Sequence, residues 1–295
     1  MKPKIYIRVD GNAELGLGHF IRCIALAHML KDDFRITCIS SSIPDKIKFE
    51  LSASHFKHKQ ISTEYDFLQL ILIGNIVVLD GYCFDSSYQR DIKRRGGKLV
   101  CIDDLHDGEY YADLIINHAP GISPQDYHAQ PYTRFALGVE YVLLRPAFLK
   151  QAKKTRNVDN IKTVIICFGG SDPHNLTEST LRVVASGGDF NKIIVVTGEA
   201  FHPRNDFEDL LQQDRRIVHR HALNDREMLS AMLEAELAIV PASGMLFEAL
   251  AAGCIVIAGY YVDNQLTVYQ NSIKKGLIID AKKFESDSIN DALRK

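Results

Sequence analysis

The residues best suited to chemistry lie in a glycine-rich segment, 10–19, close to the N-terminus. Its glycines permit positive φ angles and let a ligand approach the backbone closely, so Gly16 and Gly18 are candidate substrate contacts. His19 follows at the predicted first turn of a helix, where the partial positive charge disfavours an imidazolium and favours a neutral base. The segment therefore predicts a general base at His19. A glycine turn beside an incidental surface histidine is the alternative.

Several familiar signatures do not fit this sequence. A P-loop needs Lys and then Ser or Thr after its last glycine, which this segment lacks. A dinucleotide fingerprint needs G-x-G-x-x-G and an acidic residue at the end of the next strand, where this chain has Ser40. The sequence also contains no G-x-S-x-G nucleophile elbow and no H-E-x-x-H zinc motif. These motifs therefore give no reason to expect a dinucleotide cofactor or a zinc centre.

Two glycine-containing segments in the second half of the chain could hold an anion. Gly169 and Gly170 follow an apolar run and precede a helix with a proline near its start. Further on, Ser243 is the expected N-cap of a helix whose free N–H groups at Gly244 and Met245 could hold a phosphate. Both segments predict backbone recognition of phosphate groups.

Other polar residues could contact the remainder of a nucleotide. Glu248, about one turn into the predicted helix, could accept hydrogen bonds from ribose hydroxyls; a solvated glutamate on an amphipathic helix is the alternative. Asn264 and Gln265 follow the next strand, at the edge where open α/β sheets bind ligands. Asp103 and Asp104 also end a strand, and we favour loop capping over a metal site for this pair.

Alternating strands and helices must position these residues. Runs rich in Val and Ile, without polar alternation, are what a parallel sheet covered on both faces requires. In the first half they predict strands at 4–9, 35–40, 75–80, 98–104, 112–117 and 136–138, with helices at 18–30 and 86–95. In the second half they predict strands at 163–170, 192–198, 216–220, 237–242, 255–259 and 276–280, with helices after Pro173, at 225–234 and after Ser243.

A polar stretch at 151–162 separates the two series and is the best linker candidate. The chain of 295 residues is long enough for two domains. We therefore predict an N-terminal domain at 1–150 and a C-terminal domain at 151–295, as two Rossmann-like domains facing a cleft. The last fifteen residues, 281–295, resemble the start of a terminal helix, so we expect a shortened C-terminus.

Composition narrows the function classes. Apolar residues make up 46% of the chain, charged residues 24%, and the net charge is -2, which suits a globular protein and gives no sign of a nucleic-acid partner. The six cysteines include no C-x-x-C pair and sit mostly in apolar runs, as reduced structural cysteines do. No apolar run approaches the length of a membrane span. We expect a cytoplasmic monomer without cofactor or metal.

Taken together, these segments resemble the family of UDP-2,4-diacetamido-2,4,6-trideoxy-β-L-altropyranose hydrolases of pseudaminic acid biosynthesis. That family is related to the MurG-type N-acetylglucosaminyltransferases, which have the glycosyltransferase-B fold. Pro241 and Ala242 depart from its pattern, because members of the family often have a segment richer in glycine or serine at this position. The resemblance covers most of the chain and is carried by R-V-D at 8–10, G-L-G-H at 16–19, R-C-I-A-L-A at 22–27, D-G-Y at 80–82, I-D-D-L at 102–105, G-V-E-Y-V-L-L-R-P-A-F at 138–148, F-G-G-S-D at 168–172 and S-G-M-L-F-E-A-L at 243–250.

The resemblance implies hydrolysis of this UDP-sugar to UDP and the free sugar, by inverting attack of water at the anomeric carbon and without a metal. On the family's pattern His19 activates the water and Tyr82 lines the sugar site. The residues at 169–170 and 243–245 would hold the diphosphate, Glu248 the ribose, and Asn264 and Gln265 would approach the sugar and phosphates. A glycosyltransferase of the same fold, which passes the sugar to a hydroxyl acceptor, is the nearest alternative. A UDP-sugar sensor without catalytic activity is another.

Overall fold

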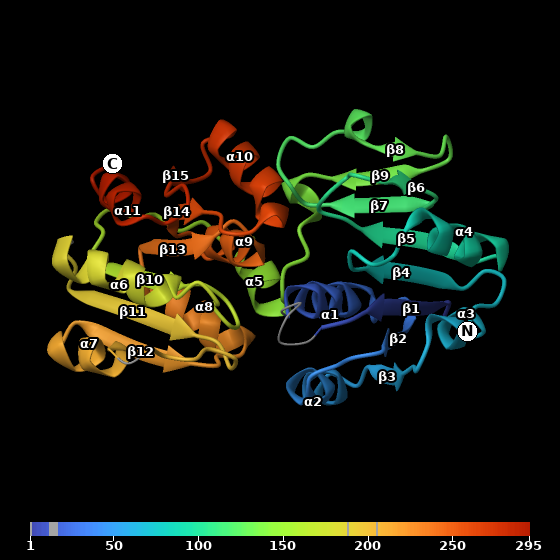
Figure 1. The fold of residues 1–295 in the computed structure, drawn as a ribbon, viewed down its shortest axis with the longest axis horizontal. Coiled ribbons are helices and arrows are strands. Elements are labelled where there is room, and N and C mark those ends of the chain that lie inside the picture. The colour runs from blue at the N-terminus through green and yellow to red at the C-terminus, as the bar shows by residue number, and fades with distance from the viewer. Residues whose placement is uncertain (1, 12–16, 188, 205) are drawn as a thin grey trace. The chain divides into compact units, whose positions relative to one another are not determined.

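The computed structural model describes residues 2–11, 17–187, 189–204 and 206–295. The chain divides into two compact units, Met1–Arg145 and Pro146–Lys295, each with its own α/β layers (Figure 1). The division falls before the position predicted between 150 and 151, because helix α5 (Pro146–Gln151) belongs to the second unit. There it packs against α8 (Asp225–Glu234) and α9 (Gly244–Ala251) and buries Phe148 completely.

The first unit is built on a seven-stranded sheet with the order β3-β2-β1-β4-β5-β7-β9, in which every pairing is parallel. A short two-stranded ladder joins β6 (Glu109–Tyr110) and β8 (His128–Ala129). The strands of the main sheet are β1 (Lys4–Val9), β2 (Arg35–Ser40), β3 (Lys57–Gln60), β4 (Ile76–Asp80), β5 (Lys98–Ile102), β7 (Leu114–Asn117) and β9 (Arg134–Leu137), and the helices are α1 (Gly18–Leu30), α2 (Asp45–Ala53), α3 (Glu64–Leu68) and α4 (Ser86–Arg94).

Strand alternation divides the side chains of this sheet between two apolar layers. Ile5, Ile7 and Val9 pack in the layer that contains the buried face of α1, whereas Tyr6 packs in the layer of α3 and α4. The same alternation in β4 places Val78 in the α1 layer. Asp80 lies two residues further along and therefore points to the same face.

The second unit is built on a six-stranded sheet with the order β12-β11-β10-β13-β14-β15, again with parallel pairings throughout. Strands β10, β11 and β13, with helices α6, α7 and α11, contribute most of the residues of one buried core. The bounds are β10 (Thr163–Cys167), β11 (Lys192–Thr197), β12 (Ile217–His221), β13 (Leu237–Pro241), β14 (Ile255–Gly259), β15 (Ile279–Asp280), α6 (Leu176–Gly187), α7 (Phe207–Gln213), α10 (Leu266–Lys274) and α11 (Ser286–Leu293).

Both sheets have a topological switch point, where the strand order reverses direction. In the first unit it lies between β1 and β4, and in the second between β10 and β13. Ligands of open parallel sheets bind at the carboxyl ends of the strands at such points. The segments after β1, β4, β10 and β13 are therefore the places where a site is expected, and they carry most of the predicted site residues.

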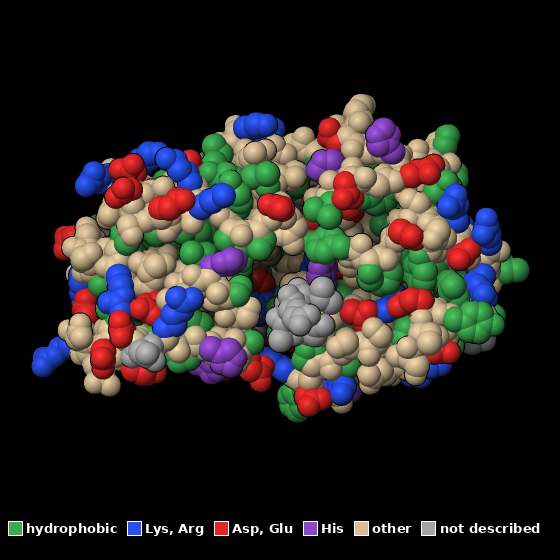
Figure 2. All heavy atoms as spheres, viewed as in Figure 1, with side chains coloured by type: hydrophobic (Ala, Val, Ile, Leu, Met, Phe, Trp, Pro, Cys, Tyr) green, Lys and Arg blue, Asp and Glu red, His purple; other side chains and the backbone are tan. Residues whose placement is uncertain are grey.

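The surface and the helices have two further properties. On the face drawn in Figure 2, acidic and basic side chains are interspersed over each unit, in keeping with a net charge of -2. Within the described ranges, no helix has both the length and the apolar character needed to cross a membrane.

Candidate active site

The first unit brings His19 and Asp80 together. His19 lies in the first turn of α1, as predicted, and its Nδ1 is 2.6 Å from Oδ1 of Asp80. Asp80 ends β4 and is only 1% exposed. Burial opposes its ionisation, but the charge of Arg22 and hydrogen bonds from Arg22 and His19 hold the pKa of this carboxyl well below its ordinary value. An ionised Asp80 can accept the Nδ1 proton of His19, which leaves Nε2 as the basic nitrogen.

Helical spacing explains why α1 supplies further groups to Asp80. Arg22 and Cys23 lie three and four residues after His19, so all three share one face of the helix. Arg22 donates from Nε to Oδ2 of Asp80 at 2.7 Å, and Cys23 Sγ lies 3.3 Å from the same oxygen. These contacts exclude the surface-histidine alternative for His19, because its side chain is only 11% exposed and belongs to a buried polar cluster.

Tyr82 lies beside this pair. Its ring meets the His19 ring edge-on, with centroids 4.9 Å apart, and its hydroxyl donates to Oδ2 of Asp104 at 3.1 Å. The Tyr82 side chain is 49% exposed, so it can contact a ligand. Gly18 is the first residue of α1, and a Cβ added there would meet nothing within 4 Å. The predicted contact at Gly16 lies outside the described residues.

Asp103 and Asp104 have different roles from each other. Asp103 accepts from the backbone N–H of His106 at 2.9 Å and from the Tyr110 hydroxyl at 2.6 Å, which confirms the loop-capping prediction for this residue. Asp104 is not a loop cap. Its carboxylate pairs with Arg22 at 2.7 and 2.8 Å, so the prediction for Asp104 was wrong. The reason is that Ile102 packs in the α1 layer, and Asp104, two residues further along the chain, lies on the same side and meets Arg22 of α1.

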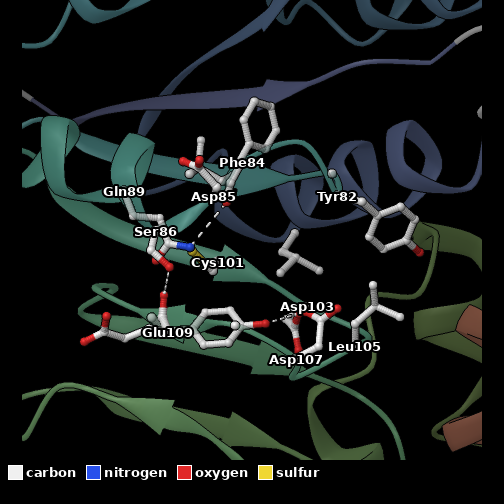
Figure 3. A pocket seen from close by; sticks show the side chains of 15 residues that line it. Tyr82, Phe84, Asp85, Ser86, Gln89, Cys101, Asp103, Leu105, Asp107 and Glu109 are labelled. Atoms are coloured by element: carbon white, nitrogen blue, oxygen red, sulfur yellow. Dashed lines mark hydrogen bonds between the residues drawn. The ribbon is translucent and has the colours of Figure 1, made fainter.

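A pocket of about 270 Å³ adjoins Tyr82 (Figure 3). Tyr82 and Leu105 lie at one end of it, and Ser86 and Gln89 lie at the other. Four carboxylates line the pocket, whereas no Lys or Arg is among its described lining residues. This charge favours neutral hydroxylated or cationic groups and disfavours phosphate. The lining carboxylates are Asp85, Asp103, Asp107 and Glu109.

In the second unit, the loop after β10 differs from its predicted role at one point. Gly169 has a φ of 89°, a conformation that favours glycine. However, the N-terminus of α6 is already occupied, since Asp172 accepts from the N–H groups of Leu176 and Thr177 at 2.9 and 2.7 Å. An anion at this loop would therefore meet the Gly169 and Gly170 backbone rather than the end of α6. A Cβ added to either glycine would meet nothing within 4 Å.

The loop after β13 matches its prediction more closely. Ser243 is the N-cap of α9, and its hydroxyl accepts from the Met245 N–H at a long 3.4 Å. At Gly244 the space that a Cβ would take is open. Glu248 is 5% exposed, so the alternative of a solvated surface glutamate was wrong. A buried carboxylate one turn into the helix that Ser243 caps fits recognition of hydroxyl groups.

Asn264 and Gln265 lie in a short 3-10 turn, Asp263–Gln265, directly before α10. The side-chain oxygen of Gln265 accepts from the Tyr261 N–H at 3.1 Å, so Gln265 stabilises its own loop. Asn264 is half-buried beside it. In the part of the chain that the structure describes, no three His, Cys, Asp or Glu residues gather in a group that could hold a metal ion.

The fold belongs to a known class. The chain has the glycosyltransferase-B fold, with two Rossmann-like domains. MurG of Acinetobacter baumannii superposes with a TM-score of 0.65 over 99% of this chain and 90% of that structure, at 12% identity. The calicheamicin glycosyltransferase CalG4 superposes with a TM-score of 0.62 over 99% of this chain and 89% of that structure, at 14% identity.

Comparison of sequences finds relatives that are 24–29% identical to the chain. No family model matches the chain. The chain is 25% identical to the UDP-2,4-diacetamido-2,4,6-trideoxy-β-L-altropyranose hydrolase of Campylobacter jejuni, over 95% of this chain and 99% of that protein. It is 24% identical to the spore coat polysaccharide biosynthesis protein SpsG of Bacillus subtilis, over 93% and 82%. An uncharacterised protein of Methanocaldococcus jannaschii is 29% identical over 92% of this chain, which spans only 58% of that relative.

Proposed function

We propose that this protein hydrolyses a UDP-linked sugar to UDP and the free sugar. The observation that carries the proposal is the contact between His19 and the buried, ionised Asp80 at the switch point of the first sheet. A histidine held in this way can take a proton from water or from a hydroxyl group. The choice of water is supported by the C. jejuni relative, whose name describes a hydrolase and which aligns over 99% of its own length.

The proposed substrate is UDP-2,4-diacetamido-2,4,6-trideoxy-β-L-altropyranose. The water oxygen bonds to the anomeric carbon as Nε2 of His19 takes one of its protons. The bond between that carbon and the diphosphate oxygen breaks, and UDP leaves with the electron pair. Attack from the opposite side inverts the anomeric configuration. Because backbone N–H groups can stabilise the departing diphosphate, the reaction needs neither a general acid nor a metal.

The binding residues divide between the two ends of the substrate. In the first unit Tyr82, with the backbone at Gly16 and Gly18, contacts the sugar. In the second unit Glu248 accepts hydrogen bonds from the ribose, and Asn264 and Gln265 approach the sugar and phosphates. The backbone groups that hold the diphosphate are those of Gly169, Gly170, Ser243, Gly244 and Met245.

The test is incubation with the UDP-sugar in ¹⁸O-labelled water without any acceptor. The proposal expects UDP release, the label in the anomeric hydroxyl of the free sugar, and an initial NMR signal from the inverted anomer. The variant His19→Ala should lose about 10²–10⁴-fold in turnover, while the exposed-histidine control His128→Ala should not. Binding of the UDP-sugar without any release would identify a sensor instead. Label in the phosphate would contradict attack at carbon.

A glycosyltransferase is the second candidate function, and the pocket beside Tyr82 is the observation that favours it. Its volume of about 270 Å³ and its carboxylate lining suit a neutral, hydroxylated acceptor. In that case His19 would deprotonate an acceptor hydroxyl. Repeating the assay with a panel of monosaccharides separates the two functions. Release of UDP that depends on an added sugar, with a new glycosidic bond, would replace the hydrolase proposal.

A further inference from the structure

Arg22 lies between two carboxylates and contacts both through separate edges of its guanidinium group. Its Nε and one terminal nitrogen donate to the two oxygens of Asp80 at 2.7 and 2.6 Å. The other terminal nitrogen donates to both oxygens of Asp104 at 2.7 and 2.8 Å. The Arg22 side chain is 14% exposed, so these charge-assisted bonds form away from most of the solvent.

The two carboxylates each contact a residue of the proposed site. Asp80 contacts His19 at 2.6 Å, and Asp104 accepts from the Tyr82 hydroxyl at 3.1 Å. The chain of contacts therefore runs from His19 through Asp80, Arg22 and Asp104 to Tyr82, and a terminal nitrogen of Arg22 also lies 3.1 Å from Nδ1 of His19. It is closed by the edge-on contact between the Tyr82 and His19 rings. Neither Arg22 nor Asp104 needs to touch a ligand to affect both ends.

From this arrangement we infer that Arg22 is a positioning residue that fixes His19 and Tyr82 relative to each other through Asp80 and Asp104. The inference rests on the proposed function only for its catalytic consequence, since the contacts exist without a substrate. It has one consequence for ligand recognition. Because the Tyr82 hydroxyl donates its hydrogen bond to Asp104, the phenolic oxygen presents its lone pairs to a ligand and can accept hydrogen bonds from hydroxyl or amide N–H groups.

Two ionised carboxylates surround the charge of Arg22. Despite burial, the charge of Arg22 lowers the pKa of both Asp80 and Asp104, so two negative charges surround one positive charge. Burial lowers the pKa of His118 to about 4 and raises that of Cys23, so both are neutral near pH 7. The titratable groups that face the guanidinium from α1, β4 and the segments after β5 and β7 are His19, Cys23, Asp80, Asp104 and His118.

Two substitutions separate positioning from charge. Arg22→Lys keeps the charge but loses the planar fork that contacts both carboxylates, so kcat should fall by about 10²-fold with the acid limb of the pH profile unchanged. Arg22→Gln also loses the charge, so the pKa of Asp80 rises and the acid limb should move to higher pH. In the Arg22→Lys background, Tyr82→Phe should cost less than in the unmodified protein. The control Arg94→Lys, in an exposed pair with Asp91, should change none of these.

A measurement without substrate keeps this inference separate from the proposed function. In ¹⁵N-imidazole NMR spectra of the full chain, His19 should appear as the Nδ1–H tautomer with a strongly hydrogen-bonded proton, and Arg22→Lys should weaken that signature. If the Arg22 variants do not fold, Asp104→Asn provides the same test, because its cost and the cost of Tyr82→Phe should not add when the two substitutions are combined. An unchanged His19 spectrum in Arg22→Lys, or full additivity of Asp104→Asn with Tyr82→Phe, would overturn the inference.

Discussion

Nδ1 of His19 and Oδ1 of Asp80 lie 2.6 Å apart although 61 positions separate the two residues in the sequence. The contact exists because β1 and β4 are neighbours in the sheet, so the helix after β1 starts beside the end of β4. A carboxylate behind a histidine fixes the ring and selects which nitrogen carries the proton. The pair therefore gives His19 a defined basic nitrogen at a switch point of the fold.

Replacing Asp80 by Asn should remove most activity. An amide can donate to Nδ1 and so stabilise the other tautomer, which places the proton on the nitrogen that must accept one. We expect kcat to fall by about 10²–10⁴-fold, measured with UDP release in single-turnover and steady-state assays. Asp45→Asn is the control, since the Asp45 side chain is 97% exposed. Near-normal turnover of Asp80→Asn would exclude a role for the carboxylate in orienting His19.

His118 should make stability depend on pH in a defined window. Burial lowers its pKa from 6.5 to about 4, so between these values the unfolded chain binds a proton that the folded chain does not. The free energy of unfolding should then decrease as the pH falls through this window, by at most about 1.4 kcal/mol per pH unit. Urea titrations from pH 7 to pH 4 measure the slope, which should be flatter in His118→Gln and unchanged in His128→Gln.

The carboxylates contribute in a different, more acidic window. The pKa values of Asp80 and Asp104 are held below their ordinary value of 3.8. Stability from their ionised forms is therefore complete above pH 3.8 and lost as the pH falls further. A substitution of Asp80 or Asp104 that flattens the slope of unfolding free energy against pH only below pH 3.8 would assign that part of the titration to these carboxylates rather than to His118.

Gly198→Ala should damage the glycine loop of the second unit. A Cβ at Gly198 would lie 2.3 Å from the carbonyl oxygen of Gly170 and 2.4 Å from its Cα, so the backbone must shift. We expect a loss of roughly 1–3 kcal/mol in unfolding free energy and weaker UDP binding by calorimetry. Gly108→Ala is the matched control, because a Cβ there meets nothing within 4 Å. Unaltered UDP affinity in a destabilised Gly198→Ala would argue against this loop as the diphosphate site.

Glu248 can be tested by pairing a variant with a modified ligand. If its carboxylate accepts from the ribose, the unmodified protein should bind 2′-deoxy-UDP more weakly than UDP, by about 1.5–3 kcal/mol for a hydrogen bond to a charged group. Glu248→Gln should weaken UDP binding and reduce the difference between the two ligands. An equal preference for UDP in both proteins would place the ribose elsewhere.

The sequence predicts the regular elements well where the hydrophobic pattern is strong. The helices at 18–30 and 225–234 have the predicted bounds, because both carry clear apolar faces, and α8 has an Asn224 cap. Strand β3 was not predicted, since its residues, KHKQ, are polar and mostly exposed at the sheet edge. Its pairing with β2 is made by backbone hydrogen bonds, which no hydrophobic pattern in the sequence indicates.

The site was predictable only in part, for a physical reason. Glycine segments and the Ser243 cap are local features and can be read from neighbouring residues. The contacts of Asp80, Arg22 and Asp104 depend on which strands are neighbours, so no local pattern reveals them. One signal was present: Arg22 and Cys23 follow His19 at helical spacing, and an arginine on the buried face of a helix needs an acidic partner.

The side chains around His19 all come from the first unit. Arg22 and Cys23 lie on α1, Asp80 ends β4, and Tyr82 and Asp104 lie just beyond β4 and β5. The imidazole and the charges around it are thus held together by the fold of one unit. Water around a substrate would have to reorganise as charge develops, whereas dipoles and charges fixed by folding do not. In the proposed reaction, the free-energy cost of orienting the proton acceptor would therefore be met once, during folding, rather than in every catalytic cycle.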